Sequence, residues 1–452
     1  MFKIFTLKIN GIEKKSLMQY KNIAITSISK ILYAGISFLI VPLLINQVTT
    51  YQYGLFTTIV TATTWLSLVD GGLSNGIKNK LTMALANKNF LEAQKITSTA
   101  YFTLFGFVAI FSIILLIISN FLNWNLLFNA NANNATTVNF LFVFGGICFL
   151  VKLLVDLITV VLQCHQQTGF ASIIQLFIQV LVYFFILGVK YFYDDKNIKL
   201  YAIGYFIIPI LVLLATNFIL FSKKFNYIKP SYKFCDFKKQ KNLFKLSGQF
   251  FIIQTAAIII FTTDNLIISR FFNYIEVAKY NIAFRYFNII TFVHVIVLTP
   301  YWTAITDAYT KNDIIWIKKS VRQLQIIWFI IILLALTMLA GAPFAYKIWI
   351  HPNFAIAPIL NIGMFLFIII SCWNNIYATF LNAVGKIKIQ FYASIFVGII
   401  NIPFCIILIK YTTLGPSAVI FATSGCLMFG SFWAPIQYYK LINKKAEGIW
   451  NK

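Results

Sequence analysis

The stretch that decides the fold runs from Ser98 to Asn120 and reads STAYFTLFGFVAIFSIILLIISN. It contains no Asp, Glu, Lys or Arg, and about 20 apolar residues in a helix are enough to cross the hydrocarbon core of a bilayer. Comparable stretches recur from residue 23 to residue 440, with short polar breaks between them. Overall, 60% of the 452 residues are hydrophobic and only 11% are charged, against about a quarter charged in soluble proteins. The sequence therefore predicts an all-α integral membrane protein.

About twelve transmembrane helices are expected, which places both chain ends on one side of the membrane. The predicted spans are residues 23–47, 54–73, 98–120, 138–162, 170–190, 200–222, 247–270, 280–306, 322–345, 355–383, 387–410 and 414–440. About 27 of the 37 Lys and Arg residues lie in the N-terminus, the even-numbered loops and the C-terminal tail, and about 7 lie in the odd-numbered loops. Because positive residues gather on the cytoplasmic side, both termini are expected to be cytoplasmic.

The formal net charge of +25 does not indicate a nucleic-acid-binding protein. Such a protein gathers its cations into one patch or stripe, whereas here they alternate between loops. The longest basic segment, residues 223–245, is predicted to be a cytoplasmic linker, and contact with anionic lipid headgroups is the alternative. Residues 74–97 are predicted to form an amphipathic helix on the same side, with Ile77, Leu81, Leu85 and Leu91 as its apolar positions.

The second half of the chain looks like a diverged copy of the first. LQCHQQTGFASIIQLFIQVLVYFFIL, from Leu162, aligns with LNAVGKIKIQFYASIFVGIINIPFCIIL, from Leu381, with Gly169 over Gly385. Parallel repeats of this kind occur in transporters, and chance similarity among apolar helices is the alternative. The repeat predicts two pseudo-symmetric six-helix lobes, residues 1–222 and 247–452, joined by a basic cytoplasmic linker at residues 223–246.

Seven ionisable residues inside the predicted spans are the candidate functional residues. A charge in hydrocarbon costs at least about 2.5 to 3.5 kcal/mol on insertion scales, so an intramembrane charge is a functional hypothesis by default. The seven are Lys30, Asp70, Lys152, Asp156, Asp264, Arg285 and His294.

Two pairs of these residues are predicted to interact. Lys152 and Asp156 are four residues apart, so they share a helix face, and a purely structural ion pair is the alternative to a transport role. Asp264 and Arg285 fall in the outer half of adjacent antiparallel spans. A carboxylate that exchanges an Arg for a proton or Na⁺ would couple an ion gradient to motion.

The remaining three candidates have competing interpretations. Lys30 is expected at about the same membrane depth as Asp70. It could contact substrate, form a salt bridge at the inner end of the span, or extend its ammonium group to the lipid headgroups. Asp70 precedes a Gly- and Ser-rich stretch, so helix capping alone is an alternative role. His294 in mid-span could shuttle protons or could simply bond to a neighbouring helix.

Motifs for enzymatic chemistry are missing from the sequence. There is no G-x-x-x-x-G-K-[ST] phosphate loop, no H-E-x-x-H zinc pair and no C-x-x-C pair, so no cofactor, metal site or disulfide is expected. Residues 72–76 match G-x-S-x-G, but that motif needs a preceding strand, whereas a membrane helix is predicted there. The chain is therefore expected not to be an enzyme, and uphill transport would draw on an ion gradient, the membrane potential or the substrate's own gradient.

Three segments resemble the polysaccharide-biosynthesis flippases of the MOP superfamily, which translocate O-antigen or other lipid-linked oligosaccharides. The segment GISFLIVPLLINQVTTYQYGLFTTIVTATTWLSLVDGGLSNGIKNKLTMALA, from Gly35, has the landmarks Pro42, Tyr53-Gly54 and Asp70-Gly71 in order. The segment TTDNLIISRFFNYIEVAKYNIAFRYFN, from Thr262, is similar to the family's seventh and eighth spans, and LNAVGKIKIQFYASIFVGIINIP, from Leu381, to its tenth and eleventh. Together these segments extend the resemblance over most of the chain.

The resemblance implies a MATE-like, two-lobe flippase of the bacterial inner membrane. Its implied task is to carry an undecaprenyl-diphosphate-linked oligosaccharide, an O-antigen or capsule repeat unit, from the cytoplasmic to the outer leaflet by alternating access. It implies that Lys30, Lys152 and Arg285 receive the diphosphate and that Asp70 and Asp264 are motif acids. The residues expected to serve coupling or gating are Asp70, Asp156, Asp264 and His294. The expected partners are the lipid-linked oligosaccharide, membrane lipids, H⁺ or Na⁺, and a glycan polymerase.

Two other functions compete with this one. A cation-coupled exporter of small amphipathic molecules shares the superfamily and would present an acidic cavity. Here the three intramembrane acids are equalled in number by three intramembrane cations. A membrane glycosyltransferase or glycan polymerase would place its catalytic residues in a large outer loop, but every predicted outer loop is short. The balance of charge favours the flippase.

Overall fold

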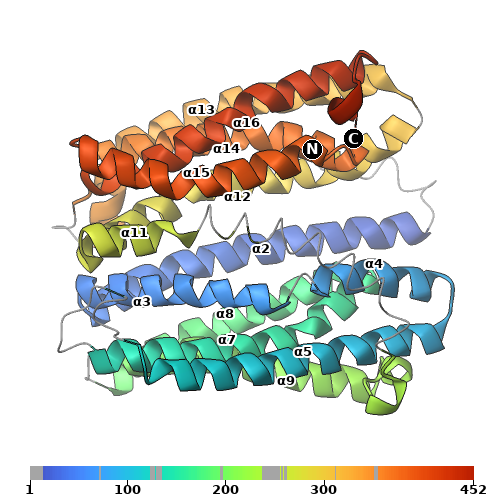
Figure 1. Ribbon diagram of the computed structural model, residues 1–452, viewed down its shortest axis with the longest axis horizontal. Coiled ribbons are helices and arrows are strands. Elements are labelled where there is room, and N and C mark those ends of the chain that lie inside the picture. Colours follow the sequence, from blue (N-terminus) through green and yellow to red (C-terminus); the bar gives the residue numbers. More distant parts are fainter. Residues whose placement is uncertain are drawn as a thin grey trace. The chain divides into compact units, whose positions relative to one another are not determined.

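The structure, a computed structural model, describes residues 14–70, 73–122, 128, 135–193, 197–236, 255, 258, 262–310, 312–350 and 355–451. Throughout these ranges the regular elements are α-helices and short 3-10 helices, without a strand, which confirms the all-α prediction. The chain divides into two compact units (Figure 1). Unit 1 comprises Met1–Gln47, Thr63–Trp124 and Ala132–Ile252, and unit 2 comprises Val48–Ala62, Asn125–Asn131 and Ile253–Lys452.

Unit 1 is built on long helices that pack along their lengths. These are α2 (Lys14–Gln47), α4 (Leu73–Ala86), α5 (Phe90–Ser119), α7 (Ala135–Cys164), α8 (Thr168–Phe192) and α9 (Ile198–Ser222). Helix α2 packs on α8, and α7 packs on both α5 and α9. Helix α8 shows why: Ile174, Ile178, Val182 and Ile186 recur every four residues and are buried, while the opposite face exposes large apolar side chains. Such a helix suits protein on one side and lipid on the other.

Unit 2 is organised around a central helix. Its main helices are α3 (Thr50–Thr64), which ends in unit 1, α11 (Asp264–Phe271), α12 (Tyr274–Thr310), α13 (Ile314–Trp349), α14 (Pro358–Val384), α15 (Lys388–Tyr411) and α16 (Ala418–Ile442). Helix α14 packs on α12, α13 and α16, and α15 packs on α16 (Figure 1). A buried core of Leu298, Leu324, Ile376 and Phe380 holds α12, α13 and α14 together.

The Tyr53-Gly54 landmark has a packing reason. A Cβ atom at Gly54 would lie 1.8 Å from the backbone oxygen of Tyr274. Only glycine therefore lets α3 approach the start of α12 this closely. The ring of Tyr51 also meets the ring of Tyr274 edge-on at 5.1 Å, so this end of α3 is fixed within unit 2.

The described residues contain ten helices that are long and apolar enough to cross a membrane. The predicted second span, residues 54–73, is not one long helix but α3 followed by the 3-10 turn η2 (Trp65–Asp70). The predicted seventh span, residues 247–270, lies largely outside the described residues, and its described end contains α11 from Asp264 onward. About twelve spans fit this set of helices.

The amphipathic helix predicted over residues 74–97 is shorter than expected. Helix α4 ends at Ala86, because Lys88 adopts a left-handed conformation with φ of 55° and Asn89 caps α5. Ile77 and Leu81 are buried, and α4 packs on α5 and α7. The assignment of Leu91 to this helix was wrong, because Leu91 lies in the first turn of α5 and is exposed.

The alignment of the two internal repeats needs one correction. Gly385 ends α14 in a left-handed conformation with φ of 70°, and the matching turn after α7 places Gln166 at φ of 58°. In both turns the next backbone N–H bonds to a carbonyl five residues earlier. Gly169 lies inside α8, where a Cβ would approach Ile25 to 3.1 Å. Gln166, and not Gly169, is therefore the counterpart of Gly385.

The basic segment predicted as a linker is described as far as Asp236, and that part packs on unit 1. It contains the 3-10 turns η4 (Asn226–Ile228) and η5 (Tyr232–Phe234). The N–H of Ser231 donates to Ser98 Oγ at 3.1 Å, and the N–H of Asp236 donates to Thr99 Oγ1 at 3.1 Å. Residues 223–236, called the docked segment below, are thus held against α5.

His165 holds the start of the docked segment through its ring. Its ring stacks on Phe225 at 4.2 Å, and Nε2 lies 2.8 Å from the hydroxyl of Tyr227. Nδ1 lies 2.7 Å from the backbone oxygen of Val161. Burial lowers the pKa of His165 from its ordinary value, and the positive charge of Lys224 acts in the same direction.

Candidate functional site

Asp70 serves as a helix cap in unit 1. Its carboxylate is buried and accepts hydrogen bonds from the backbone N–H of Ser74, at 3.2 Å, and from the Ser74 hydroxyl, at 3.1 Å. Ser74 lies in the first turn of α4, where backbone N–H groups lack partners in the helix. The capping interpretation therefore accounts for the contacts of Asp70, and a further transport role stays a prediction.

Lys152 and Asp156 lie on one face of α7 and interact electrostatically. Among the described residues they do not form a direct ion pair. The Asp156 carboxylate instead accepts a hydrogen bond from Gln175 Nε2 of α8 at 3.3 Å. Tyr101 of α5 also interacts electrostatically with Asp156, and its hydroxyl donates to Asn217 Oδ1 of α9 at 2.8 Å. Polar side chains from α5, α7, α8 and α9 therefore gather inside unit 1.

Lys30 is exposed on α2. Within the described part of the chain it makes no ion pair with Asp70. An exposed ammonium group on a membrane helix is available to a ligand or to lipid headgroups.

Asp264 lies at the centre of a buried polar cluster in unit 2. It is the first residue of α11 and is 8% exposed, and its Oδ2 accepts a hydrogen bond from the hydroxyl of Tyr280 on α12. Thr423 of α16 also faces the carboxylate. Asn401 of α15 is fully buried and donates to Thr423 Oγ1 at 3.2 Å. Four helices thus contribute one residue each to a polar cluster around this carboxylate. These four residues are called the Asp264 cluster.

Two buried oxygens of the Asp264 cluster lack a donor among the described residues. Asp264 Oδ1 and Asn401 Oδ1 are both buried, and neither has a hydrogen-bond partner among the described residues. Buried acceptors without donors are costly. A proton or a hard cation, which prefers oxygen ligands, would satisfy these two oxygens. The neighbouring Asn265, by contrast, is fully occupied by Thr61 and Asn281.

Arg285 does not reach the Asp264 cluster. It lies farther along α12, is exposed and interacts electrostatically with the buried Tyr53. Within the described residues the structure gives no ion pair between Asp264 and Arg285, because Asp264 is bonded to Tyr280. The predicted exchange between these two charges therefore has no starting contact in this structure.

His294 is buried in α12, with 1% of its surface exposed. Neither ring nitrogen has a hydrogen-bond partner among the described residues. A hydrogen bond to a neighbouring helix was the alternative to a proton-shuttle role for His294, and the described part of the chain contains no such bond. A neutral imidazole tolerates such surroundings better than a charged one.

A cavity of about 420 Å³ lies between α12 and α14 in unit 2. Helix α12 contributes Val295, Leu298, Thr299 and Trp302, and helix α14 contributes Asn375, Ala378, Thr379 and Asn382. The lining contains carboxamides, hydroxyls and one indole, and no charged side chain. This space is called the α12–α14 cavity.

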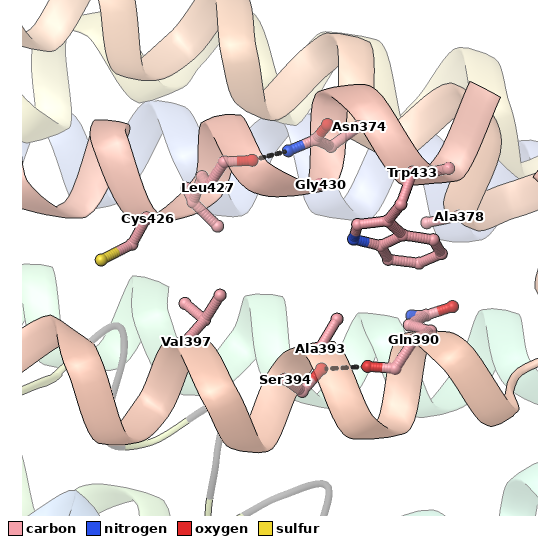
Figure 2. A pocket seen from close by; sticks show the side chains of 11 residues that line it. Asn374, Ala378, Gln390, Ala393, Ser394, Val397, Cys426, Leu427, Gly430 and Trp433 are labelled. Atoms are coloured by element: carbon pink, nitrogen blue, oxygen red, sulfur yellow. Dashed lines mark hydrogen bonds between the residues drawn. The ribbon is translucent and has the colours of Figure 1, made fainter. Parts of the chain in front are cut away.

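A second cavity, of about 160 Å³, lies on the other side of α14, against α15 and α16 (Figure 2). Its lining is mostly apolar, with Val397, Cys426 and small residues such as Gly430. Asn374 faces this space but is occupied, since its Nδ2 donates to the Leu427 backbone oxygen at 2.7 Å (Figure 2). Its Oδ1 accepts the Ser431 hydroxyl at 2.8 Å, so Asn374 joins α14 to α16.

The described residues hold no cluster of His, Cys, Asp and Glu ligands. No group of three or more His, Cys, Asp or Glu side chains gathers there in a way that could hold a metal ion. All six cysteines are free.

The neutral residues of the α12–α14 cavity were missed by a search for intramembrane charges. Asn375, Thr379 and Asn382 are spaced i, i+4 and i+7, so they share one face of α14. That spacing of amides and a hydroxyl inside an apolar segment was the available signal. Trp302 carried no signal of its own, because aromatic residues are frequent throughout this chain.

The family model described as "Polysaccharide biosynthesis protein" matches residues 20–306. The chain belongs to the polysaccharide biosynthesis protein family. A second family model, MatE, matches residues 251–407, and the expected membership of the MOP superfamily is confirmed.

Two relatives match this polysaccharide biosynthesis family member along most of their length. A Yersinia pseudotuberculosis protein named for O-antigen export is 23% identical over 370 residues, covering 80% of this chain and 82% of the relative. A Salmonella typhi protein named for O-antigen transport is 22% identical over 375 residues, with the same two coverages.

Solved structures show that the family member has the MATE fold. An inward-facing multidrug resistance MATE transporter of the MOP superfamily superposes with a TM-score of 0.72 at 13% identity, covering 93% of this chain and 96% of that one. A MATE structure in the bent conformation gives a TM-score of 0.63 at 13% identity, covering 96% and 100%. The predicted two-lobe, MATE-like fold is confirmed.

Proposed function

We propose that this protein is a flippase that carries an undecaprenyl-diphosphate-linked oligosaccharide from the cytoplasmic to the outer leaflet of the bacterial inner membrane. The observation that carries the proposal is its similarity, over 80% of the chain, to two proteins named for O-antigen export and transport. The match to the polysaccharide biosynthesis family supports the same cargo class. The protein works by alternating access of its two lobes, with both termini in the cytoplasm and a glycan polymerase as the partner that uses the flipped unit.

The physical task explains the polar side chains inside a membrane protein. A bare charge in hydrocarbon costs tens of kcal/mol, and an unpaired polar group costs several more. A carrier must therefore surround the head group with polar side chains while the lipid tail stays in the bilayer. Lys30, Lys152 and Arg285 receive the diphosphate, and the exposure of Lys30 and Arg285 keeps both within reach of a ligand.

We assign the coupling ion to the Asp264 cluster. A proton or Na⁺ bound there would supply the positive partner that Asp264 Oδ1 and Asn401 Oδ1 lack among the described residues. Because the cluster joins α11, α12, α15 and α16, binding or release of that ion changes the packing of four helices together. We assign gating to Asp70 and Asp156, which accept hydrogen bonds from neighbouring protein groups in this structure.

A cation-coupled exporter of small molecules is the second candidate, and the likeness to MATE multidrug transporters favours it. An exporter of lipophilic cations would present a carboxylate to its cargo. Asp70, Asp156 and Asp264 instead accept hydrogen bonds from protein side chains, and the α12–α14 cavity is uncharged. These contacts support the flippase over the exporter.

The test is a complementation assay in cells that lack the protein. We expect the wild type to restore surface glycan, and Arg285→Ala and Asp264→Asn to leave lipid-linked oligosaccharide stranded in the inner leaflet. Arg322→Ala is the matched control, because Arg322 is exposed on α13 and outside the proposed machinery. Surface glycan that survives full deletion of the protein would overturn the flippase and favour the exporter.

A further inference from the structure

The α12–α14 cavity combines an aromatic surface with unpaired carboxamides. The indole of Trp302 is 45% exposed. The side-chain amides of Asn375 and Asn382 make no hydrogen bond to any residue that the structure describes, although both line the cavity. Asn374, the neighbour of Asn375, has its amide committed to α16. The open amides therefore lie on one side of α14 only.

The hydrogen-bonding pattern of the lining is specific. A carboxamide both donates and accepts. The hydroxyls of Thr299 and Thr379 already donate to the backbone oxygens of Val295 and Asn375, at 2.8 and 2.7 Å, so toward the cavity they offer lone pairs. A ligand that fits this lining must carry several groups that donate and accept at once. Hydroxyl groups on adjacent carbons meet that requirement.

The arrangement also has direction and length. Asn375, Thr379 and Asn382 form a polar stripe along two turns of α14, which extends about 10 Å. Trp302 lies on the facing helix, α12. A ligand in the cavity would therefore meet hydrogen-bonding groups on one side and an apolar ring surface on the other. A sugar ring has both, because its hydroxyls project from its edge while its C–H groups form an apolar face that packs on an aromatic ring.

Other ligand classes fit the cavity less well. A diphosphate needs cations, and a lipophilic cation needs a carboxylate, but no charged residue lines the cavity. An acyl or prenyl chain would leave two carboxamides without partners in an apolar environment, which costs free energy. Diphosphates, lipophilic cations and lipid chains therefore all lack complementary groups in this lining. The volume of about 420 Å³ is within the usual range of small-ligand sites.

We propose that the α12–α14 cavity is a subsite for neutral sugar rings of the cargo, with Trp302 as the stacking surface and Asn375 and Asn382 as the groups that select among sugars. This inference rests on the proposed flippase function and adds to it a separation of tasks: the cations hold the diphosphate, and unit 2 reads the glycan through uncharged groups. Residues that select the cargo would then differ from residues that drive transport.

The experiment measures binding by the purified full-length protein in detergent. The probe is the repeat-unit oligosaccharide released by mild acid from the cell's own lipid carrier, titrated by calorimetry. We expect Trp302→Ala to weaken binding by about tenfold or more, and Asn375→Ala and Asn382→Ala by about two- to tenfold each. Inorganic pyrophosphate and tetraphenylphosphonium should not displace the oligosaccharide.

Matched controls separate binding from folding. Trp316→Ala removes an exposed indole on α13. Asn443→Ala removes a half-buried amide after α16 that accepts a hydrogen bond from Lys318. Neither residue lines the cavity. Both should bind the probe as the wild type does, and all variants should keep a wild-type melting temperature. If Trp302→Ala does not fold, Asn375→Ala and Asn382→Ala carry the test.

The outcomes distinguish this inference from the flippase proposal. The sugar subsite is overturned if the wild type does not bind the oligosaccharide, if the cavity variants bind it as tightly as the wild type, or if tetraphenylphosphonium displaces it. The flippase function is overturned separately, by surface glycan that persists after full deletion. Loss of binding together with stranded lipid-linked oligosaccharide in Asn375→Ala cells supports both.

Discussion

Replacing Asp264 by Asn is the perturbation that tests the coupling site most sharply. The change keeps the size of the side chain but removes the charge that a bound ion would neutralise. In the wild type, Asp264 Oδ1 and Asn401 Oδ1 are buried without partners among the described residues. Each unsatisfied buried acceptor costs about 1–3 kcal/mol. An ion that satisfies both is expected to raise the free energy of unfolding by about 2–6 kcal/mol.

The assay is thermal unfolding of the purified protein in detergent, with NaCl replaced by choline chloride at constant ionic strength. At a ligand concentration of 100 times Kd, linkage predicts a stabilisation of about 2.7 kcal/mol, which is within the range expected from the two acceptors. The wild type should be stabilised by Na⁺, or by added protons if the ion is H⁺, and Asp264→Asn should lose that dependence.

Asp313→Asn is the control for this experiment, because Asp313 caps α13 through the Trp316 N–H and lies outside the Asp264 cluster. It should keep the ion dependence of the wild type. The reasoning is refuted if the wild type responds equally to Na⁺ and choline and shows no pH response that Asp264→Asn removes. It is also refuted if Asp264→Asn retains the full response.

Three further predictions concern single contacts. Gly54→Ala should lower stability by at least about 1–3 kcal/mol, because its Cβ would overlap the Tyr274 oxygen, whereas Gly35→Ala, with open space around it, should melt like the wild type. Asp70→Ala should lower the free energy of unfolding by about 1 kcal/mol, because the helix cap is lost, whereas Asp70→Asn should keep the wild-type melting temperature. Loss of export in Asp70→Asn would then reveal a role beyond capping. Burial lowers the pKa of His165, so the docked segment should stay bound to unit 1 at pH 7.5. It should loosen as the pH falls below about 6.5, because the imidazole of the undocked state takes up a proton first. Hydrogen exchange over residues 223–236 measures this loosening, and His165→Phe should show no pH dependence.

Hydropathy could predict most of the fold because of a physical constraint on membrane helices. A span must satisfy every backbone group internally, so each appears as a long apolar segment. The second span escaped this rule. Thr57 and Thr58 bond back to backbone oxygens within α3, and the segment then tightens into a 3-10 turn before Asp70. Local polar bonding of this kind is invisible to a hydropathy average.

The candidate site was only partly predictable, because charge in a sequence does not reveal its partner. Asp264 was found, but its bonding to Tyr280 and its place beside Asn401 depend on how four helices pack. Neutral side chains were harder still. Asn374 and Asn375 are adjacent and identical in type, yet one joins two helices and the other lines a cavity. Their different orientation follows from the rotation of α14, which tertiary packing sets.

The central claim is that this protein moves a lipid-linked oligosaccharide between leaflets, and reconstitution tests it most directly. Purified protein in liposomes would be given a fluorescent prenyl-diphosphate-linked oligosaccharide, and dithionite would bleach the outer leaflet at timed intervals. The account predicts that wild-type liposomes exchange the labelled lipid between leaflets and that Arg285→Ala liposomes do so far more slowly. Exchange no faster than in protein-free liposomes, under an imposed Na⁺ or proton gradient of either direction, would contradict it.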